Sequence, residues 1–358
     1  MPNKVFFFRF TSTDPDKKVS AGLRKLFEIA DLYACLKAGD ITAVKVHFGE
    51  KGNTSFLPAK YVAPIVECIK KTGAKAFVTD TNVLYKSARD NAVDHLQLAF
   101  GHGFRLQTLG APVIIADGIS GHNEVAIRID APLNSSVNLA AEIVKADSVI
   151  VVSHATGHIG TGLAATIKNM GMGMSSRRGK LAQHSVSKPV INAKKCTRCG
   201  ACLNWCPADA IRMEDTSAVI DEPTCIGCGE CLTVCRFGAV RFQWNSSNLR
   251  LQHQIAEHAL GIVRQKQEKI GFMTFMINMT KNCDCMAQKP EYLIEDIGVV
   301  AGRDPVAIDQ AVYDLTRDSR GDNLPALAYP DIDAAEQLIY GEKIGLGSRK
   351  YILEEIKA

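Results

Sequence analysis

Short apolar runs alternate with longer stretches of helical periodicity along the first part of the chain. Runs rich in Val, Ile and Phe are typical of buried strands, whereas apolar residues three or four positions apart indicate helices that cover a sheet. The pattern predicts strands at 4–8, 42–47, 75–79, 112–116 and 147–152, with a further strand near 124–129. Between them it predicts helices at 18–38, 58–72, 84–101 and 134–146.

The alternation resumes after residue 245. Here it predicts a helix at 246–268, strands at 271–279 and 296–301, and helices at 304–317, 332–341 and 350–357. Strands that alternate with helices favour an α/β fold with a mostly parallel sheet in Rossmann-like layers. We therefore expect one α/β domain, formed by residues 1–190 and 246–358, with a separate domain inserted at 191–245. The stretch 171–189 is rich in Gly, Ser, Arg and Lys, which is typical of a loop leading into an insert.

Composition narrows the classes of protein to which the chain can belong. It is 46% hydrophobic and has a net charge of +4. This small charge and the 7% aromatic content do not favour nucleic-acid binding. No apolar stretch reaches the roughly eighteen residues that a membrane span needs. The first residues lack a signal-peptide cleavage site, so we expect a cytoplasmic protein whose twelve cysteines stay reduced.

Eight of the twelve cysteines lie in two runs of identical spacing. The runs are Cys196, Cys199, Cys202 and Cys206, followed by Pro207, and Cys225, Cys228, Cys231 and Cys235, followed by Arg236. Each cysteine of the second run lies 29 residues after its counterpart, since 225 − 196 and 235 − 206 both give 29. This regularity indicates an internal duplication.

The spacing is typical of bacterial ferredoxins that hold two [4Fe–4S] clusters. In these proteins three cysteines of one run ligate one cluster and the fourth ligates the other. We therefore assign one cluster to Cys196, Cys199, Cys202 and Cys235, and the second to Cys225, Cys228, Cys231 and Cys206. The insert is expected to be a ferredoxin-like α+β domain. The alternative is a pair of zinc sites, but zinc motifs usually separate pairs of cysteines by long spacers.

Polar residues follow several of the predicted strands. His47, with Glu50 after it, ends one strand, Asp80 and Asp117 end two others, and His154 ends the strand at 147–152. Because ligands bind beyond the carboxyl ends of the strands in open α/β sheets, these endings predict a site. Asp80 and Asp117 have an equally good alternative as residues of turns or helix caps.

A Gly-rich stretch continues from the last of these strands. It contains His154, His158, Gly160 and Gly162, and Lys168 follows. The two histidines could bind a metal or polarise a substrate oxygen. Alternatively, the glycines could hold an anion at the start of the next helix with Lys168 as its charge partner. The remaining possibility is a tightly packed loop without a ligand. We favour a functional loop and predict His47, His154, His158 and Lys168 as catalytic residues.

Four cysteines lie outside the ferredoxin-like runs. Cys283 and Cys285 are two positions apart, so in an extended chain both sulfur atoms face the same side and could ligate one metal. They could also be two thiols of a loop. Cys35 and Cys68 lie within apolar helical patterns and are predicted core residues. Asp304 before Pro305 is typical of a helix start, which leaves Asp309 as a weaker candidate for a site.

These features together resemble the domain-of-unknown-function family numbered 362, in members that carry a ferredoxin insert. The matching residues are Lys45 to Glu50, Asp80 to Asn82, Ala116 to Gly118, the stretch 153–173 with Lys168 and Asn169, Cys283 to Cys285, and Asp304 to Asp309. The resemblance covers nearly the whole chain. It implies an iron–sulfur protein of anaerobic or microaerobic cytoplasm and supplies no reaction.

Three functions are compatible with the sequence. In the first, two [4Fe–4S] clusters pass electrons to a site at the strand ends, so that the chain is a ferredoxin-linked oxidoreductase of unknown substrate; the size of the α/β part favours this. In the second, the chain is an electron-transfer subunit or docking protein for a partner redox enzyme. A factor that assembles metals or cofactors on Cys283 and Cys285 is a third. The expected partner is a redox protein or a small-molecule substrate, and a further metal or organic cofactor is possible.

Overall fold

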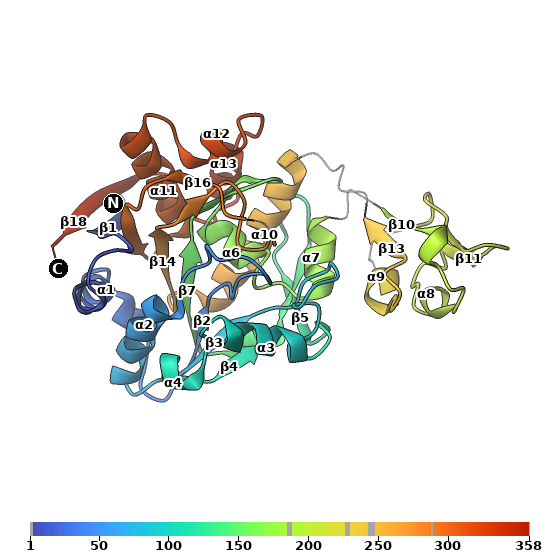
Figure 1. The fold of residues 1–358 in the computed structure, drawn as a ribbon, viewed down its shortest axis with the longest axis horizontal. Helices are drawn as coiled ribbons and strands as arrows, with labels where there is room; N and C mark the ends of the chain where they lie inside the picture. The colour runs from blue at the N-terminus through green and yellow to red at the C-terminus, as the bar shows by residue number, and fades with distance from the viewer. Residues whose placement is uncertain (1–2, 185–187, 226–229, 243–247, 288, 358) are drawn as a thin grey trace.

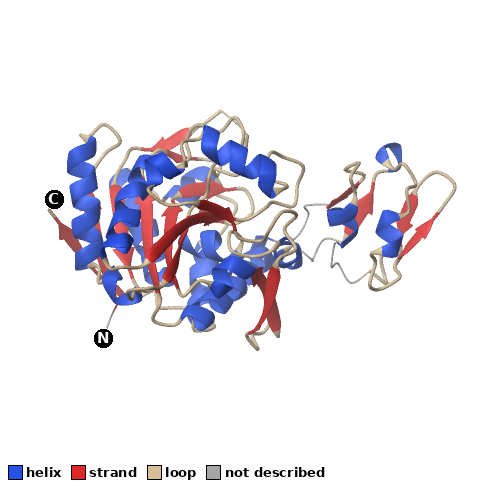
Figure 2. Cartoon of the chain, turned by 90° about the horizontal axis from the view of Figure 1, so that it is seen from below, coloured by secondary structure: helices blue, strands red, loops and turns tan. Residues whose placement is uncertain are grey.

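A computed structural model describes residues 3–184, 188–225, 230–242, 248–287 and 289–357. Most of the chain forms a three-layer α/β domain around one sheet of eight strands (Figures 1 and 2). The strand order is β18-β1-β17-β14-β7-β2-β3-β4. The strands are β1 Asn3–Arg9, β2 Ile41–Lys45, β3 Lys75–Asp80, β4 Val113–Ile115, β7 Ser148–His154, β14 Ile270–Met276, β17 Gly298–Gly302 and β18 Tyr351–Ile356.

The sheet is mostly parallel. β7 pairs in parallel with both β2 and β14, and the same holds for β2 with β3, β3 with β4 and β1 with β18. β17 is antiparallel to both of its neighbours, β1 and β14. This mixed but largely parallel sheet agrees with the predicted α/β class.

Helices cover both faces of the sheet and create two hydrophobic cores. One core lies under the first helices, and its side chains include Leu23, Val62 and Phe104. The other lies under the later helices, with Ile167 and Ile255 among its members. The helices are α1 Asp16–Ile29, η1 Leu32–Cys35, α2 Ala59–Lys71, α3 Ala92–Gly101, α4 Leu106–Leu109, α5 Ala141–Lys145, α6 Thr166–Gly171, α7 Arg177–Gln183, α10 Asn248–Lys266, α11 Pro305–Arg320, α12 Leu324–Ala328 and α13 Ala335–Lys343.

Three small two-stranded sheets complete the α/β domain. They pair β5 Glu124–Arg128 with β6 Ser136–Ala140, β8 Thr156–His158 with β9 Gly162–Ala164, and β15 Met279–Thr280 with β16 Tyr292–Ile294. β8 and β9 contain the Gly-rich stretch, and the segment between β15 and β16 contains Cys283 and Cys285. No described helix is long and apolar enough to cross a membrane.

The cysteine-rich part of the chain, residues 189–242, lies apart from the large sheet and projects from one end of the domain in both views (Figures 1 and 2). We call it the cysteine module. Its strands β10 Pro189–Ile191 and β13 Val240–Phe242 pair antiparallel, as do β11 Ile211–Met213 and β12 Ala218–Ile220. Its helices are η2 Ala193–Lys195, α8 Ala201–Asn204 and α9 Glu230–Val234.

Four predicted helices differ from the structure. The helix predicted at 18–38 ends at Ile29, because Asp31 adopts a left-handed conformation with φ 54° before η1 begins. The helix predicted at 84–101 begins only at Ala92, where the Asn91 side chain accepts a hydrogen bond from the Asp94 N–H. The preceding residues form a loop that carries the buried Arg89 into the interior.

Two other predicted helices are strands instead. Within 134–146, Val137 and Leu139 are buried on one side of β6, and only Ala141–Lys145 is helical. The segment 350–357 forms β18, which pairs with β1 at the edge of the sheet. Local helix propensity predicts the opposite, because the edge of β1 that stabilises this strand is remote in sequence.

Candidate functional site

The strand order creates a switch point between β2 and β7. From β2 the chain adds β3 and β4 on one side, and it then returns to place β7 on the other side of β2. Crevices outside the carboxyl ends of strands occur at such switch points and are where open α/β sheets bind ligands. The predicted residues His47, Asp80 and His154 follow or end β2, β3 and β7, so the fold brings their strand ends to one edge.

A buried ion pair occupies the centre of this edge. The Lys45 Nζ lies 3.0 Å from Asp80 Oδ1 and donates to Asn169 Oδ1 at 2.7 Å. Both charged side chains are almost completely buried. Burial alone would raise the pKa of Asp80, but the charges around it, that of Lys45 first, hold the pKa well below its usual range. The carboxylate therefore stays ionised.

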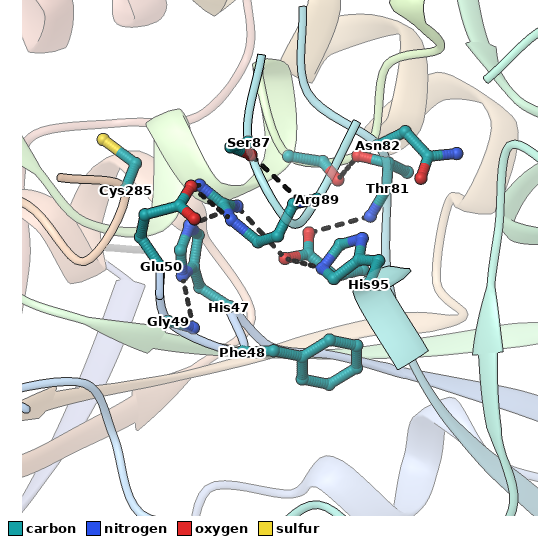
Figure 3. Close-up of polar contacts among 12 residues, drawn as sticks. His47, Phe48, Gly49, Glu50, Thr81, Asn82, Ser87, Arg89, His95 and Cys285 are labelled. Carbon is teal, nitrogen blue, oxygen red and sulfur yellow. Dashed lines mark hydrogen bonds and ion pairs between the residues drawn. The ribbon is translucent and has the colours of Figure 1, made fainter. Parts of the chain in front are cut away.

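Arg89 joins this centre to the loop after β2 (Figure 3). Its guanidinium lies 3.0 Å from Glu50 Oε2 and donates to the Tyr85 hydroxyl at 2.6 Å. His47 lies between two donors, since its Nδ1 accepts from the Gly49 N–H at 2.9 Å and its Nε2 is 2.9 Å from Arg89 Nη1. Burial, followed by the charge of Arg89, lowers the pKa of His47 well below its ordinary value. His47 is therefore a neutral ring.

Asp117 is held within the interior beside these groups. It accepts hydrogen bonds from the backbone and side-chain amides of Asn82, at 3.0 Å to the same oxygen. Lys180 donates to the Thr81 hydroxyl and to the Asn82 carbonyl, so it fixes the same turn. Asp80 and Asp117 do more than form turns or cap helices, because both belong to one network of buried charged side chains.

A pocket opens next to this network, and we call it the strand-end pocket. It encloses about 420 Å³, part of it open to solvent. Its lining includes three of the four predicted catalytic residues, His47, His154 and Lys168, together with Cys283 and Cys285. Burial, with a smaller contribution from Arg89, lowers the pKa of Lys168 to about 8. An amine with such a pKa is a usable proton donor and acceptor near neutral pH.

His154 is held by acceptors on both sides of its ring. Its Nδ1 lies 2.9 Å from Asp284 Oδ2 and its Nε2 lies 2.6 Å from the Ile277 carbonyl oxygen. Burial opposes the charge of the ring, but the Asp284 carboxylate and these hydrogen bonds raise the pKa of His154 above its ordinary value. With both nitrogens donating, His154 is an imidazolium that positions Asp284. The geometry therefore favours a positioning role over metal binding.

The start of the helix after the Gly-rich stretch is already occupied. The N–H groups of Thr166 and Ile167 donate to the two oxygens of Asp309, each at 2.8 Å. Burial raises the pKa of this carboxyl to about 6. Asp309 thus fills the position at which the sequence allowed a bound anion, and its role in the structure is to cap α6. Lys168 lines the neighbouring pocket instead, whereas His158 is not among the residues that line it.

Cys283 and Cys285 form a disulfide in the structure, with their Cα atoms 5.3 Å apart. Lys168 Nζ approaches the Cys283 sulfur to 3.9 Å. The predicted juxtaposition of the two sulfur atoms is thus present, in an oxidised form. Cys35 and Cys68 are buried, as core residues are.

The cysteine module gathers the four cysteines assigned to the first cluster. Cys196, Cys199, Cys202 and Cys235 line a pocket of about 340 Å³. The rest of its lining is largely nonpolar and includes Phe237 and Val240. Four sulfur atoms around one apolar space are a donor set that a [4Fe–4S] cluster fits.

Backbone amides point at several of these sulfur atoms. The N–H of Ala218 donates to Cys196 at 3.4 Å, and that of Ala239 donates to Cys235 at 3.3 Å. In the second set, Cys206 accepts from the N–H of Ala210 at 3.2 Å. Such N–H to sulfur bonds are typical of the protein shell around iron–sulfur clusters.

The second set of cysteines is described only in part. Cys228 lies outside the described residues, and Cys231 is buried. The next residue, Leu232, packs against Leu84 and Leu181 of the α/β domain. Through Leu232, the helix α9 contacts the α/β domain.

Several residues of the site are absent from the sequence predictions. Arg89 was hidden within a predicted helix, and Lys180 lies in a stretch interpreted as a loop. Asp284 could have been suspected, because it lies between the two candidate metal ligands Cys283 and Cys285. Arg89 and Lys180 give no such signal, since only the fold shows that their charges are buried.

Comparison with known proteins gives a family and a weak structural likeness. The sequence model of a family described as Domain of unknown function (DUF362) matches residues 42–314. No curated protein matches the chain. Two solved structures with low similarity are the lactate racemase apoprotein from Thermoanaerobacterium thermosaccharolyticum, at 10% identity and TM-score 0.38, and a Thermotoga maritima protein, at 8% and 0.39. The matches cover 77% and 74% of this chain, which spans only about half (50% and 51%) of theirs.

Proposed function

The chain belongs to the family of unknown function DUF362, and we propose that it is an iron–sulfur redox protein. In this proposal two [4Fe–4S] clusters in the cysteine module pass electrons to a site at the strand ends of the α/β domain. The observation that carries it is the gathering of Cys196, Cys199, Cys202 and Cys235 around one apolar pocket, in the set that the duplicated spacing assigns.

The same spacing assigns Cys206, Cys225, Cys228 and Cys231 to the second cluster. When bound, such clusters supply one-electron transfer. The contact of Leu232 with Leu84 and Leu181 supports an electron path from the second set toward the α/β domain. The loop of Leu84 also contains Arg89 and so belongs to the strand-end site.

The residues of the strand-end pocket favour a small, anionic substrate. Lys168 provides a positive charge beside the opening, and the adjacent His47 is neutral. Lys168 can bind an acidic group of a substrate and can also move a proton, because its pKa is about 8. His154 and Asp284 neutralise each other and hold the wall of the pocket in place.

A second function, electron transfer to a partner enzyme, is favoured by the surface of the module. Trp205, next to Cys206, is 55% exposed, and Phe237, near Cys235, is 50% exposed. Large exposed apolar side chains beside the predicted clusters are suited to docking of another redox protein. In this alternative the α/β domain does not turn over a substrate.

Anaerobic reoxidation of the reduced protein separates the two functions. The clusters would first be reduced with dithionite. Small carboxylates or redox proteins would then be added as electron acceptors, and the return of the visible absorbance of the clusters would be followed. The redox-enzyme proposal predicts that Lys168→Met slows reoxidation by a small acceptor and leaves the extent of reduction unchanged. Reoxidation by proteins alone, at a rate that Trp205→Ala lowers and Lys168→Met does not, would favour the partner role.

A further inference from the structure

A second group of metal-ligating atoms joins the two cysteines of the strand-end pocket to His158, and it is well separated in sequence from the cysteine module. One ring nitrogen of His158 and the sulfur atoms of Cys283 and Cys285 all lie within 4.8 Å of one another. Thiolate and imidazole are the donors that Zn²⁺ and similar thiophilic cations prefer. At zinc–ligand distances of about 2.0–2.3 Å, tetrahedral ligands lie roughly 3.5–4 Å apart. The imidazole nitrogen is already near the sulfur atoms, and reduction of the disulfide must let the two sulfur atoms separate.

The segment that carries the two cysteines is fixed from several sides. The Glu50 N–H donates to the Asp284 carbonyl oxygen at 2.9 Å, and the Tyr85 hydroxyl donates to the Cys285 carbonyl oxygen, also at 2.9 Å. His154 holds the Asp284 side chain. Cys285 lies beside Glu50 and His47 in Figure 3. The sulfur atoms are thus presented by a preorganised loop, as a metal site requires.

A glycine allows this loop to approach His158. A Cβ atom at Gly157 would lie 2.2 Å from the Lys281 carbonyl oxygen and 2.4 Å from the Ala328 Cβ. Any other residue would therefore push the segment that begins at Lys281 away from β8. Because His158 directly follows Gly157, this close contact is what brings its ring to the two sulfur atoms.

The surroundings of His158 can orient its ring for a metal. Its Nδ1 is 3.0 Å from Thr161 Oγ1, and the Thr161 hydroxyl donates to the Leu163 carbonyl oxygen at 2.7 Å. Thr161 can therefore accept the Nδ1 proton, which leaves Nε2 unprotonated for a cation. The Gly160 N–H, 3.1 Å from Nδ1, can donate to this nitrogen in the other tautomer, in which the proton is on Nε2. A bound metal would select the first of these two forms.

We propose that, in the reduced protein, Cys283, Cys285 and His158 form a three-ligand site for a thiophilic divalent cation of the Zn²⁺ class. The fourth position opens to the pocket, where Lys168 lies 3.9 Å from the Cys283 sulfur and favours an anionic exogenous ligand. Three protein ligands and one open position are the arrangement of catalytic zinc sites. The inference goes beyond the redox proposal, because it depends on none of the module's cysteines.

The disulfide is the oxidised state of the same pair. A dithiol reductant supplies two electrons and two protons, leaves as its own disulfide, and converts Cys283–Cys285 into two thiols. Metal binding then releases the thiol protons, since thiolates are the ligands. Oxidation removes two of the three ligands and so releases the metal.

Equilibrium dialysis against Zn²⁺ tests the site on the full chain, reduced without oxygen and with its iron–sulfur content loaded. We expect one zinc per chain that is absent from the Cys283→Ser/Cys285→Ser variant and from the disulfide form. Cys35→Ser, at a buried cysteine outside the site, is the matched control and should keep the zinc. His158→Gln should weaken binding at least about tenfold, and Thr161→Val by about 10- to 100-fold.

A second readout needs no variant. Zinc should protect Cys283 and Cys285 of the reduced wild-type chain from alkylation, as located by mass spectrometry, and a chelator should restore their reaction. Equal zinc content in wild type and double variant, together with unprotected thiols, would overturn the proposal. Iron content and the EPR signal after reduction are measured in parallel, because they fail only if the redox proposal is wrong.

Discussion

The cysteine module and the strand-end site differ in how their residues are brought together. In the module, three closely spaced cysteines of the first run and Cys235 of the second run line the pocket. Few side chains are buried; among the described residues the nonpolar ones are Pro189, Ala210, Ala218, Cys231, Ala239 and Val240. At the strand ends, Lys45, Asp80 and Asn169 meet from three remote segments inside a large core. We therefore expect the fold of the module to depend on the proposed clusters, whereas the strand-end site is built by packing.

The largest expected effect comes from removing the iron of the proposed clusters. Because the module has too small a core to stabilise itself, chelation after oxidative cluster loss should unfold residues 189–242 and leave the α/β domain folded. Limited proteolysis with mass spectrometry should then show cleavage confined to the module. Equal protease resistance with and without iron would show that the module, too, is held by packing.

Breaking the central ion pair should affect the α/β domain strongly. Lys45→Met leaves the buried Asp80 carboxylate without its partner and should lower the free energy of unfolding by about 3–5 kcal/mol. The control is Lys4→Met, which removes the exposed pair with Glu354 and should cost about 1 kcal/mol or less. Both would be measured by urea unfolding, followed by circular dichroism, on iron-loaded protein. Similar losses in the two variants would contradict a buried, ordered charge network.

An intermediate effect is expected from a buried histidine of α10. Burial lowers the pKa of His258 to about 4, from 6.5 in an unfolded chain. Below pH 6.5 the unfolded state therefore binds a proton that the folded state excludes, so stability falls as the pH falls. Between pH 7 and pH 5 this residue should cost about 2 kcal/mol. The difference in unfolding free energy between wild type and His258→Leu should change by that amount between pH 7 and pH 5. A difference that does not change with pH would contradict the lowered pKa of His258.

The smallest effect concerns one hydrogen bond at the edge of the site. Tyr85 accepts from Arg89 at 2.6 Å and donates to the Cys285 carbonyl oxygen at 2.9 Å. Tyr85→Phe should lower the free energy of unfolding by about 1 kcal/mol, because Arg89 keeps its contact with Glu50. Urea unfolding followed by circular dichroism, as for Lys45→Met, measures this loss. A loss as large as that of Lys45→Met would show that the site depends on this one loop.

The same contrast explains what the sequence could predict. The eight cysteines are recognisable because ligand spacing is local, and the α/β class follows from alternating strand and helix patterns. His47, Asp80 and His154 were found because they end strands, and parallel strands place their carboxyl ends at one edge.

The sequence could not predict interactions that depend on tertiary packing. Arg89 contributes through its contact with Glu50, and its loop was interpreted as helix. Asp309 caps a helix more than a hundred residues earlier in the chain. The strand at Tyr351–Ile356 forms because the edge of β1 is available to it. No local pattern contains these partners.

The most direct test of the redox proposal is a metal and sulfide inventory of protein purified without oxygen, with an EPR spectrum after reduction. The proposal predicts roughly eight iron and eight sulfide per chain and a signal from reduced [4Fe–4S] clusters that Cys-to-Ser changes at Cys196 or Cys225 diminish. Iron far below that level after anaerobic reconstitution, with zinc on the cysteines of the module instead, would contradict it.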